Sequence, residues 1–383
     1  MSTRLAVGLI GVGGFGATHL KTLQRLEAEG LVRLVCVADP DDERLVDTRR
    51  ALAERDVRWH GDYRRLLDDE TKLDAVGVAA PIHLHEEIAA AALARDLFVY
   101  LEKPPVPLIQ QLDGLIARDI RRRVVVGFQL IHSHPVQELK QWATQGALGD
   151  IKSLRVHGCA PRSPAYYARA PWAGKMIHEG KPVFDGPATN AMSHWLNNIM
   201  YLAAKHKDEF DAPVEIEAEL CRVKSIESYD TIRMRGRLNS GADFQYAVTH
   251  ATDNAVPCRL EILGSKGRAW IIENEAAAAS DLGLPSSAPA CADPFTECWR
   301  EFVRYASGKT SRARTHLPDT RGYVLATNSA LISSGGIHDI DLEAIRFASG
   351  AGVSQALNGR PVKCQDVLSL NLSEYRTSAE PGR

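Results

Sequence analysis

Short apolar runs alternate with amphipathic segments over the first third of the chain. Mostly apolar runs of strand length lie at residues 5–10, 31–38, 74–80, 97–101 and 124–128. The segments between them carry apolar residues at helical spacing, as at Leu20, Leu23 and Leu26. Strands that alternate with helices predict a parallel sheet covered on both faces. Because ligands of such sheets bind beyond the carboxyl ends of the strands, the residues after each run are candidates for a site.

The pattern changes at about residue 214. Between residues 214 and 273 apolar and polar positions alternate, and in 231–238 Ile232, Met234 and Leu238 alternate with three arginines. The sequences NSGAD (239–243) and GSKG (264–267) predict hairpin turns. This part of the chain therefore predicts antiparallel strands with one face packed on helices. Residues 275–292, rich in Ala, Ser and Pro, predict a loop.

The first apolar run continues directly into a glycine-rich turn, GVGGFG at residues 11–16. Gly11 suits the tight turn after the strand, Gly13 leaves room for a pyrophosphate, and Gly16 lets the next helix pack closely. Gly14 and Phe15 complete the turn. Phosphates would lie at the helix N-terminus, where N–H groups and the helix dipole favour anions.

Asp39 ends the second predicted strand, about 20 residues after the glycines. A carboxylate there can accept both ribose hydroxyls of NAD and would repel the 2′-phosphate of NADP. The alternative is that Asp39, beside Pro40, caps the next helix. Since Arg44 can contact a phosphate, NADP is not excluded, but we expect NAD.

Strand, glycine turn, helix, strand and acid in this order predict a Rossmann domain with a doubly wound parallel sheet in residues 1–128. We expect an α+β domain with a large, mostly antiparallel open sheet in residues 129–375. Residues 376–383 predict a disordered tail.

Composition excludes several classes of protein. The 383 residues are 45% hydrophobic and 25% charged, with a net charge of −2, which leaves room for two domains but predicts no nucleic-acid or polybasic membrane surface. No stretch has the length of a membrane span or a secretory signal, so we expect a cytoplasmic protein. The seven cysteines form no C-x-x-C pair or zinc-like cluster, so we expect reduced thiols and no metal.

Glu102-Lys103-Pro104 follows the fourth of the apolar runs. A lysine at this end of a strand can donate a hydrogen bond to a substrate oxygen and stabilise developing negative charge. The alternative is a surface lysine paired with Glu102. By the same argument from strand ends, Pro81, His85 and Gln129 are candidates for cofactor binding, together with Glu102 and Lys103.

These motifs resemble the glucose-fructose oxidoreductase/inositol dehydrogenase (Gfo/Idh/MocA) family. The resemblance rests on GVGGFG, PIHLH (81–85), EKP (102–104), GF (127–128), ILGSKGRAWI (262–271) and NGRPV (358–362). It implies an enzyme that oxidises hydroxyls of sugars or polyols, or reduces the ketones, with NAD(P). It also implies that Lys103 contacts the substrate and that His85 lies near the cofactor.

The family usually places an Asp and a His four residues apart on one helix of the second domain. This chain has Asn190 and His194 at those positions, and Asn197 where another acid is common. His194 can act as a general acid or base because histidine titrates near neutral pH. Asn190 has no titratable proton and can only orient a hydroxyl or His194. The alternative is that His194 is a core residue.

Residues 160–186 form an aromatic and basic insert that predicts an irregular active-site loop. Its flat apolar side chains and interspersed donors suit a sugar ring or an anionic sugar. The expected substrate contacts here are Arg162, Tyr166, Tyr167, Trp172, Lys175 and His178, with Arg169, Lys181 and Asp185 as further candidates. The alternatives are an arm that packs on a neighbouring subunit and, for Asp185, a helix cap.

The favoured hypothesis is an NAD-dependent oxidoreductase acting on a sugar, polyol or sugar acid, with Lys103 and His194 at the reacting carbon and Asn190 beside them. The first alternative is an NAD-dependent glycosidase in which Tyr166, Tyr167 or His178 supplies the base for an elimination. A non-catalytic NAD or sugar sensor is the second. The resemblance implies that the second domain, residues 129–375, binds the substrate. In relatives the open sheet of this domain is commonly an oligomer interface, so we expect a homodimer or homotetramer.

Overall fold

The computed structural model describes residues 4–41, 43–70, 72–285, 291, 293–340 and 359–368. The chain divides into two compact units. The first unit comprises Met1–Val106, Gln111–Gln129 and Asp293–Thr320, and the second comprises Pro107–Gln110, Leu130–Ala292 and Arg321–Arg383. The tail expected at residues 376–383 lies outside the described residues.

The sheet of the first unit has six parallel strands in the order β3-β2-β1-β4-β5-β6. The strands are β1 (Leu5–Ile10), β2 (Val32–Ala38), β3 (Arg58–His60), β4 (Ala75–Val78), β5 (Phe98–Leu101) and β6 (Val124–Val126). All residues of β1, β4 and β6 are buried, as expected for parallel strands covered on both faces. The predicted doubly wound sheet is confirmed.

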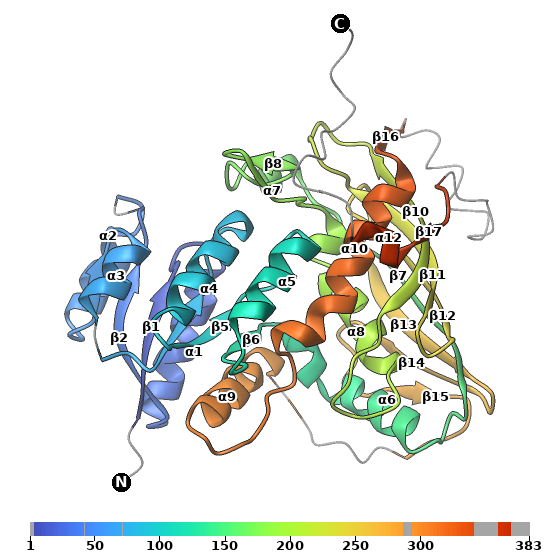
Figure 1. Cartoon of the computed structure of the whole chain (residues 1–383), viewed down its shortest axis with the longest axis horizontal. Coiled ribbons are helices and arrows are strands. Elements are labelled where there is room, and N and C mark those ends of the chain that lie inside the picture. The colour runs from blue at the N-terminus through green and yellow to red at the C-terminus, as the bar shows by residue number, and fades with distance from the viewer. Residues whose placement is uncertain are drawn as a thin grey trace, which may run out of the picture. The chain divides into compact units, whose positions relative to one another are not determined.

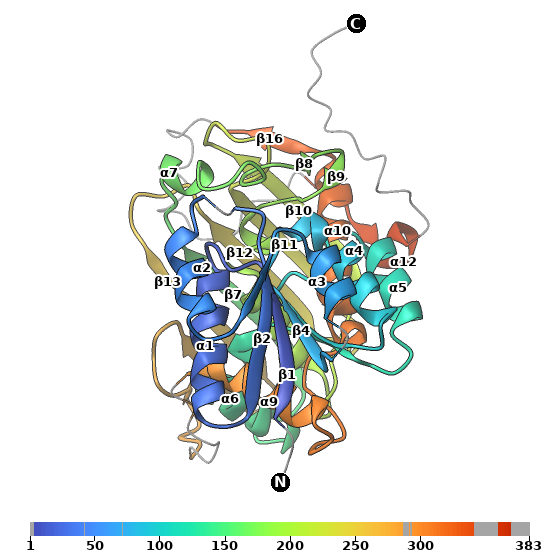
Figure 2. The ribbon, with the colours of Figure 1, turned by 90° about the vertical axis from the view of Figure 1, so that its left-hand side faces the viewer.

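Helices of the first unit cover both faces of this sheet (Figure 2). They are α1 (Gly16–Ala28), α2 (Val46–Ala53), α3 (Tyr63–Asp69), α4 (His85–Leu93) and α5 (Ile109–Arg118), with the short 3₁₀ helix η1 at Ile82–Leu84. The first two residues of α5 are grouped with the second unit. The helical spacing of Leu20, Leu23 and Leu26 is confirmed, because all three are buried on α1. Figure 2 shows α1 and α2 on one side of the strands and α3 and α4 on the other.

A late segment, Asp293–Thr320, returns to the first unit. It carries α9 (Pro294–Ala306) and η4 (Leu317–Thr320), and α9 is the orange helix that lies with the blue and cyan elements in Figure 1. Trp299 of α9 stacks on Tyr100 of β5 with ring centroids 4.0 Å apart. A Cβ atom at Gly77 would come within 2.8 Å of the Trp299 ring, so β4 needs glycine there.

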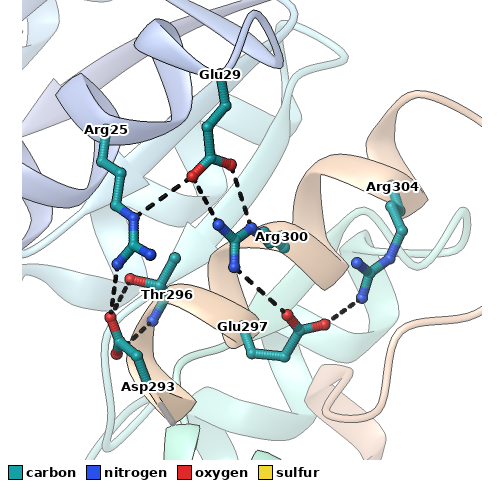
Figure 3. Close-up of polar contacts among 7 residues, drawn as sticks. All are labelled: Arg25, Glu29, Asp293, Thr296, Glu297, Arg300 and Arg304. Atoms are coloured by element: carbon teal, nitrogen blue, oxygen red, sulfur yellow. Dashed lines mark hydrogen bonds and ion pairs between the residues drawn. The ribbon is translucent and has the colours of Figure 1, made fainter. Parts of the chain in front are cut away.

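The domain boundary expected between residues 128 and 129 placed residues 293–320 in the second domain. In the structure this segment belongs to the first unit. The reason is coverage of the sheet, since α9 packs on α1 and β5. Figure 3 shows ion pairs between these helices at the surface: Arg300 lies 2.7 Å from Glu29, and Arg25 lies 3.3 Å from Asp293.

The second unit is built on a nine-stranded, mostly antiparallel sheet in the order β15-β14-β13-β7-β12-β11-β10-β16, with β17 also paired to β10. The strands are β7 (Ile151–Cys159), β10 (Pro213–Arg222), β11 (Thr231–Leu238), β12 (Asp243–Thr249), β13 (Val256–Gly264), β14 (Arg268–Ile272), β15 (Ala279–Ser280), β16 (Ile337–Asp339) and β17 (Val362–Lys363). β11 covers the predicted residues and buries Ile232, Met234 and Leu238.

Helices of the second unit gather on one face of this sheet (Figure 1). They are α6 (His134–Thr144), α8 (Ser193–Ala203), α10 (Arg321–Ser334) and α12 (Cys364–Val367), with η2 at Gln129–His132 and η3 at Pro187–Thr189. The predicted open α+β sheet is thereby confirmed. Among the described residues no helix is long and apolar enough to cross a membrane.

Two segments expected to be irregular contain short regular elements. The insert 160–186 includes α7 (Pro164–Tyr167) and a hairpin of β8 (Ile177–His178) and β9 (Lys181–Pro182). The segment 275–292 includes β15, which pairs with Trp270 and Ala269 of β14 because the edge of β14 offers unpaired backbone groups.

Candidate functional site

The glycine turn follows β1, and internal contacts explain two of its glycines. Gly11 has φ +87°, and a Cβ atom there would lie 2.7 Å from the Ala79 oxygen. At Gly16 a Cβ atom would lie 2.3 Å from the Gly11 oxygen. At Gly13, by contrast, the nearest atoms would be 3.6 Å away, so the protein itself tolerates a side chain. A glycine at this position keeps the backbone accessible to a ligand.

The N-terminus of α1 adds to this opening. Phe15 is the N-cap residue and makes no side-chain capping hydrogen bond. Gly14, with φ +54°, has open space where a Cβ atom would lie, and Phe15 is 50% exposed. Backbone N–H groups at such an end suit a phosphate.

Asp39 follows β2 and holds the glycine turn. Its Oδ2 accepts hydrogen bonds from the backbone N–H of Val12 (2.9 Å) and Gly13 (3.1 Å). The alternative role as a cap of the next helix is wrong, since the N-cap residue of α2 is Leu45. Arg44, the residue considered for a 2′-phosphate, lies 3.5 Å from Asp41.

His85, expected near the cofactor, is buried at the start of α4. Its Nδ1 lies 2.9 Å from the Pro104 oxygen, and its Nε2 lies 2.9 Å from the Ala80 oxygen. Burial lowers the pKa of His85, while the two carbonyl oxygens oppose that shift. His85 therefore links the ends of β4 and β5, next to Pro81, which caps η1.

Glu102 and Lys103 lie just after β5. Glu102 is only 5% exposed, and its Oε2 accepts the backbone N–H of Lys103 (3.0 Å). Lys103 is half-buried and is joined to Pro104 by a cis peptide bond. After β6, the buried side-chain oxygen of Gln129 has no hydrogen-bond partner among the described residues. A buried polar atom without a partner is rare and suits a missing ligand.

In the second unit, the expected placement of Asn190 and His194 on one helix is wrong. α8 begins at Ser193, so His194 lies on it and Asn190 lies before it. Asn190 has φ −138° and ψ −94°, and its Nδ2 donates to Asp185 Oδ1 (2.7 Å). The 3₁₀ turn that opens at Pro187, together with this hydrogen bond, holds Asn190 outside the helix.

Asp185 is an anchor of the insert and not a helix cap. It is buried, and its Oδ2 accepts the backbone N–H of Gly174 (2.7 Å). Because a carboxylate only accepts hydrogen bonds, the amide nitrogen of Asn190 must face it. The carbonyl oxygen of Asn190 is then directed away from Asp185. This contact was not predicted from the sequence, although the two residues are only five positions apart.

The buried polar positions of α8 form a stripe. His194, Asn197, Asn198 and Tyr201 are three, four and seven residues apart and share one side of the helix. The amide nitrogen and oxygen of both Asn197 and Asn198 are buried and lack hydrogen-bond partners among the described residues. Asn197 was expected at a substrate site, whereas Asn198 was not singled out.

The arginines and aromatic rings of the insert stack on one another. The Arg169 guanidinium lies 3.7 Å from the Tyr166 ring centroid and 5.0 Å from that of Trp172, and Arg162 lies 4.8 Å from Tyr166. Burial raises the pKa of both Tyr166 and Tyr167. Neither tyrosine is thus a good base at neutral pH.

Tyr167 and Lys175 line a cavity of about 440 Å³ within the second unit. Lys175 lies 3.5 Å from Glu227, which lines the same cavity. His178 and Lys181 face each other across the β8–β9 hairpin. Lys103 and His194 belong to different compact units.

The glycine turn, the acid after β2 and the strand order define a class, the NAD-binding oxidoreductases with a Rossmann fold. Residues 5–129 match the family model described as "Oxidoreductase family, NAD-binding Rossmann fold", and residues 136–270 match the GFO/IDH/MocA C-terminal domain. The chain belongs to the GFO/IDH/MocA oxidoreductase family, which confirms the resemblance found in the sequence.

Two curated relatives are inositol dehydrogenases. The chain is 30% identical to inositol 2-dehydrogenase 1 of Saccharopolyspora erythraea over 179 residues, 45% of this chain and 51% of that protein. It is 23% identical to myo-inositol 2-dehydrogenase of Thermotoga maritima over 273 residues, 69% of this chain and 74% of that protein. The chain thus spans about half the length of the first curated relatives it matches.

Solved structures share the fold. The WlbA dehydrogenase of Chromobacterium violaceum superposes with a TM-score of 0.74 at 19% identity, over 87% of this chain and 94% of that one. At this identity the likeness concerns the architecture alone.

Proposed function

We propose that this protein is an NAD-dependent oxidoreductase that acts on a CH–OH group of a polyol or sugar, with inositol-like polyols as the first substrates to test. The observation that carries the proposal is Lys103, placed at the carboxyl end of β5 in an NAD-binding domain with its backbone held by the buried Glu102. The similarity to proteins named inositol dehydrogenases supports the substrate class.

The residues of the first unit fit NAD. The open backbone at Gly13 and Gly14 suits the pyrophosphate, Asp39 suits the adenosine ribose, and the unpartnered Gln129 oxygen can accept a hydrogen bond from the ligand. When bound, NAD supplies the acceptor for the hydride that leaves the carbinol carbon.

The protein's own groups handle the proton and the substrate oxygen. Oxidation of an alcohol releases the hydroxyl proton, and in this proposal His194 accepts it. Lys103 donates a hydrogen bond to the same oxygen and stabilises its negative charge. Asn190, whose amide nitrogen is held by Asp185, offers its carbonyl oxygen to a neighbouring hydroxyl, and Asn197 offers a further amide.

The test is NADH formation by the purified protein with myo-inositol, other polyols, hexoses and sugar acids. We expect K103A to lower kcat by about 100-fold or more, the usual range for a lost proton-transfer or charge-stabilising group. K152A, at a lysine exposed on β7, serves as the matched control and should retain activity. Oxidation that K103A leaves unchanged would refute the role of Lys103.

A glycosidase that uses NAD transiently is the second candidate. The asparagine at position 190 and the aromatic insert favour it, but the raised pKa of Tyr166 and Tyr167 leaves only His178 among the expected elimination bases. Cleavage of aryl glycosides without net NADH would establish this candidate. NAD binding with neither activity would favour the non-catalytic sensor.

We also propose that the open face of the large sheet joins copies of the chain. On this face Glu215, Glu217 and Glu219 of β10 pair across the strands with Arg237, Arg235 and Arg233 of β11. The ion-pair distances are 3.5, 2.8 and 2.7 Å. Rows of opposite charge can meet a second copy of themselves in a twofold interface. Light scattering of the purified protein should give the mass of a dimer or tetramer.

A further inference from the structure

A histidine that the sequence analysis did not single out lies at the centre of the first unit. His19 of α1 is fully buried. The rings of Phe15, Tyr100, Phe295 and Trp299 surround it edge-on, with centroid distances from 4.9 to 5.8 Å. A polar ring in such surroundings needs specific partners.

Its two ring nitrogens have different partners, which fixes the tautomer. Trp299 Nε1 donates a hydrogen bond to His19 Nδ1 (3.1 Å). Since an indole N–H can only donate, Nδ1 must be unprotonated, and the proton of the ring lies on Nε2. Nε2 lies 3.2 Å from Glu102 Oε1, within ion-pair distance, although the two atoms do not have the geometry of a hydrogen bond. The protonated nitrogen of the ring is therefore next to the carboxylate.

The second oxygen of that carboxylate reaches the candidate catalytic lysine. Glu102 Oε2 accepts the backbone N–H of Lys103 (3.0 Å). The contacts thus run from Trp299 through His19 and Glu102 to the backbone of Lys103. Trp299 itself is fixed by its parallel stack on Tyr100, with an interplanar angle of 5°.

Gly127, the glycine of the GF motif, packs closely against the Glu102 carboxylate. A Cβ atom at Gly127 would lie 3.0 Å from Glu102 Oε1 and 3.0 Å from the Tyr100 hydroxyl. Gly127 N also donates to the Leu101 oxygen (2.8 Å) and so brings the end of β6 against β5. A side chain at this position would press on the Glu102 carboxylate and the Tyr100 hydroxyl, so glycine leaves room for both groups.

We propose that Trp299 and His19 are positioning residues for Lys103: they hold the Glu102 carboxylate, which in turn fixes the backbone of Lys103 at the end of β5. The inference rests on the proposed function of Lys103. It also gives a role to residues 293–320 in the first unit, because α9 of this segment carries Trp299, whose indole N–H donates to His19.

Kinetics of four variants test the proposal. H19L keeps an apolar side chain but removes both nitrogens, H19Q retains a donor and an acceptor, W299F removes the indole N–H and keeps a ring on Tyr100, and W299F/H19L combines the two losses. We expect H19L and W299F to lower kcat about tenfold or more, as a displaced catalytic group does, with KM and NAD affinity nearly unchanged. H19Q should recover most of the activity.

The double variant separates positioning from general destabilisation. Residues that act in series are not additive, so W299F/H19L should be no slower than H19L. Losses that multiply, or variants that lower the melting temperature while kcat is unchanged, would overturn the proposal.

Nuclear magnetic resonance separates this proposal from the proposed function. In ¹⁵N-histidine-labelled protein, His19 should show an unprotonated Nδ1 and a protonated Nε2, and W299F should abolish that difference. In ¹⁵N-lysine-labelled protein, the Lys103 amide signal should shift in H19L and W299F but little in H19Q. If the wild-type protein oxidises no polyol or sugar, the proposed function fails, and these signals still decide whether the contacts position Lys103. An unmoved Lys103 amide would overturn the inference.

Discussion

Single residues of the glycine turn and of the strand ends form the proposed NAD site. Gly11 and Gly16 are required by contacts within the protein, whereas Gly13 is not. This difference separates glycines that build the turn from the glycine that leaves room for a ligand. Asp39, which we propose to contact the ribose, also holds the turn, because its carboxylate accepts the backbone N–H groups of Val12 and Gly13.

The first residue-scale prediction concerns Asp39. D39A leaves two backbone N–H groups of the turn without their acceptor, which costs about 1–3 kcal/mol when such groups stay buried. We expect a lower melting temperature and NAD affinity reduced by tenfold or more. D41A, at a carboxylate paired with the exposed Arg44, is the control and should change both only slightly. Unchanged NAD affinity in D39A would contradict the role of Asp39.

A second prediction concerns the two asparagines of α8. Both amides are buried without partners among the described residues, and each carries a desolvation penalty of about 1–3 kcal/mol. N198L, a replacement of similar size, should therefore raise the melting temperature and leave activity intact. N197L should also stabilise the protein but should lower kcat/KM, because Asn197 is proposed to contact the substrate.

Thermal unfolding and steady-state kinetics of both variants check this pair. A lower melting temperature in N198L would show that a buried water satisfies the amide in solution. Full activity in N197L would remove Asn197 from the proposed substrate site.

At the scale of elements, α8 is held at its end by a buried lysine. Lys140 of α6 donates through Nζ to the carbonyl oxygen of Ala204 (2.8 Å) and to that of Tyr201. These carbonyls lie at the C-terminus of α8, where positive charge is favourable. The contact fixes the helix that carries His194 and Asn197.

Burial lowers the pKa of Lys140 from 10.5 to about 7, which gives the third prediction. Between these two values the unfolded chain holds a proton that the folded protein lacks, so the free energy of unfolding rises as pH increases through this window. Because buried tyrosines and cysteines titrate at higher pH, the comparison with K140M is made between about pH 7 and pH 9.

In that range the free energy of unfolding of the wild-type protein should rise relative to that of K140M. Urea denaturation at several pH values measures the difference. Parallel pH dependence of the two proteins would show that Lys140 keeps an ordinary pKa when folded.

Helices and strands could be predicted from the sequence where the spacing of apolar residues alone determines them. The buried runs of β1 and β4 and the alternation of β11 are direct consequences of burial on two faces or one. The start of α8 could not be predicted, because it depends on the turn at Pro187 and on the hydrogen bond between Asn190 and Asp185. The family's spacing of four residues between the Asp and the His, here Asn190 and His194, gives no information on those local contacts.

For the whole molecule, the return of α9 to the first unit was not predicted, because the expected boundary placed residues 293–320 in the second domain. Its amphipathic pattern indicates a helix with one apolar side, but not which sheet that side covers. The contact of Trp299 with Tyr100 and Gly77 decides it. For the same reason, neither His19 nor Trp299 could be assigned a place in the candidate site from the sequence.

This arrangement gives the fourth prediction. A fragment of residues 1–129 leaves the surface under α9 exposed, so it should melt at a lower temperature than a fragment in which residues 293–320 are joined to it by a flexible linker. The linked fragment carrying W299A should lose most of that gain, since truncation of a buried tryptophan typically costs 3–5 kcal/mol. Equal melting temperatures of the first two fragments would contradict the assignment of α9 to this unit.

The fate of the nicotinamide tests the proposed oxidoreductase activity. The purified protein is denatured to identify any released NAD(H), and the intact protein is then supplied with NAD and with pooled polyols, sugars and aryl glycosides while NADH absorbance is followed. We expect the protein to contain or bind NAD and to form NADH with a polyol or sugar, and we expect K103A to lose this activity. Glycoside cleavage without net NADH, or NADH formation that K103A does not affect, would contradict the proposed function.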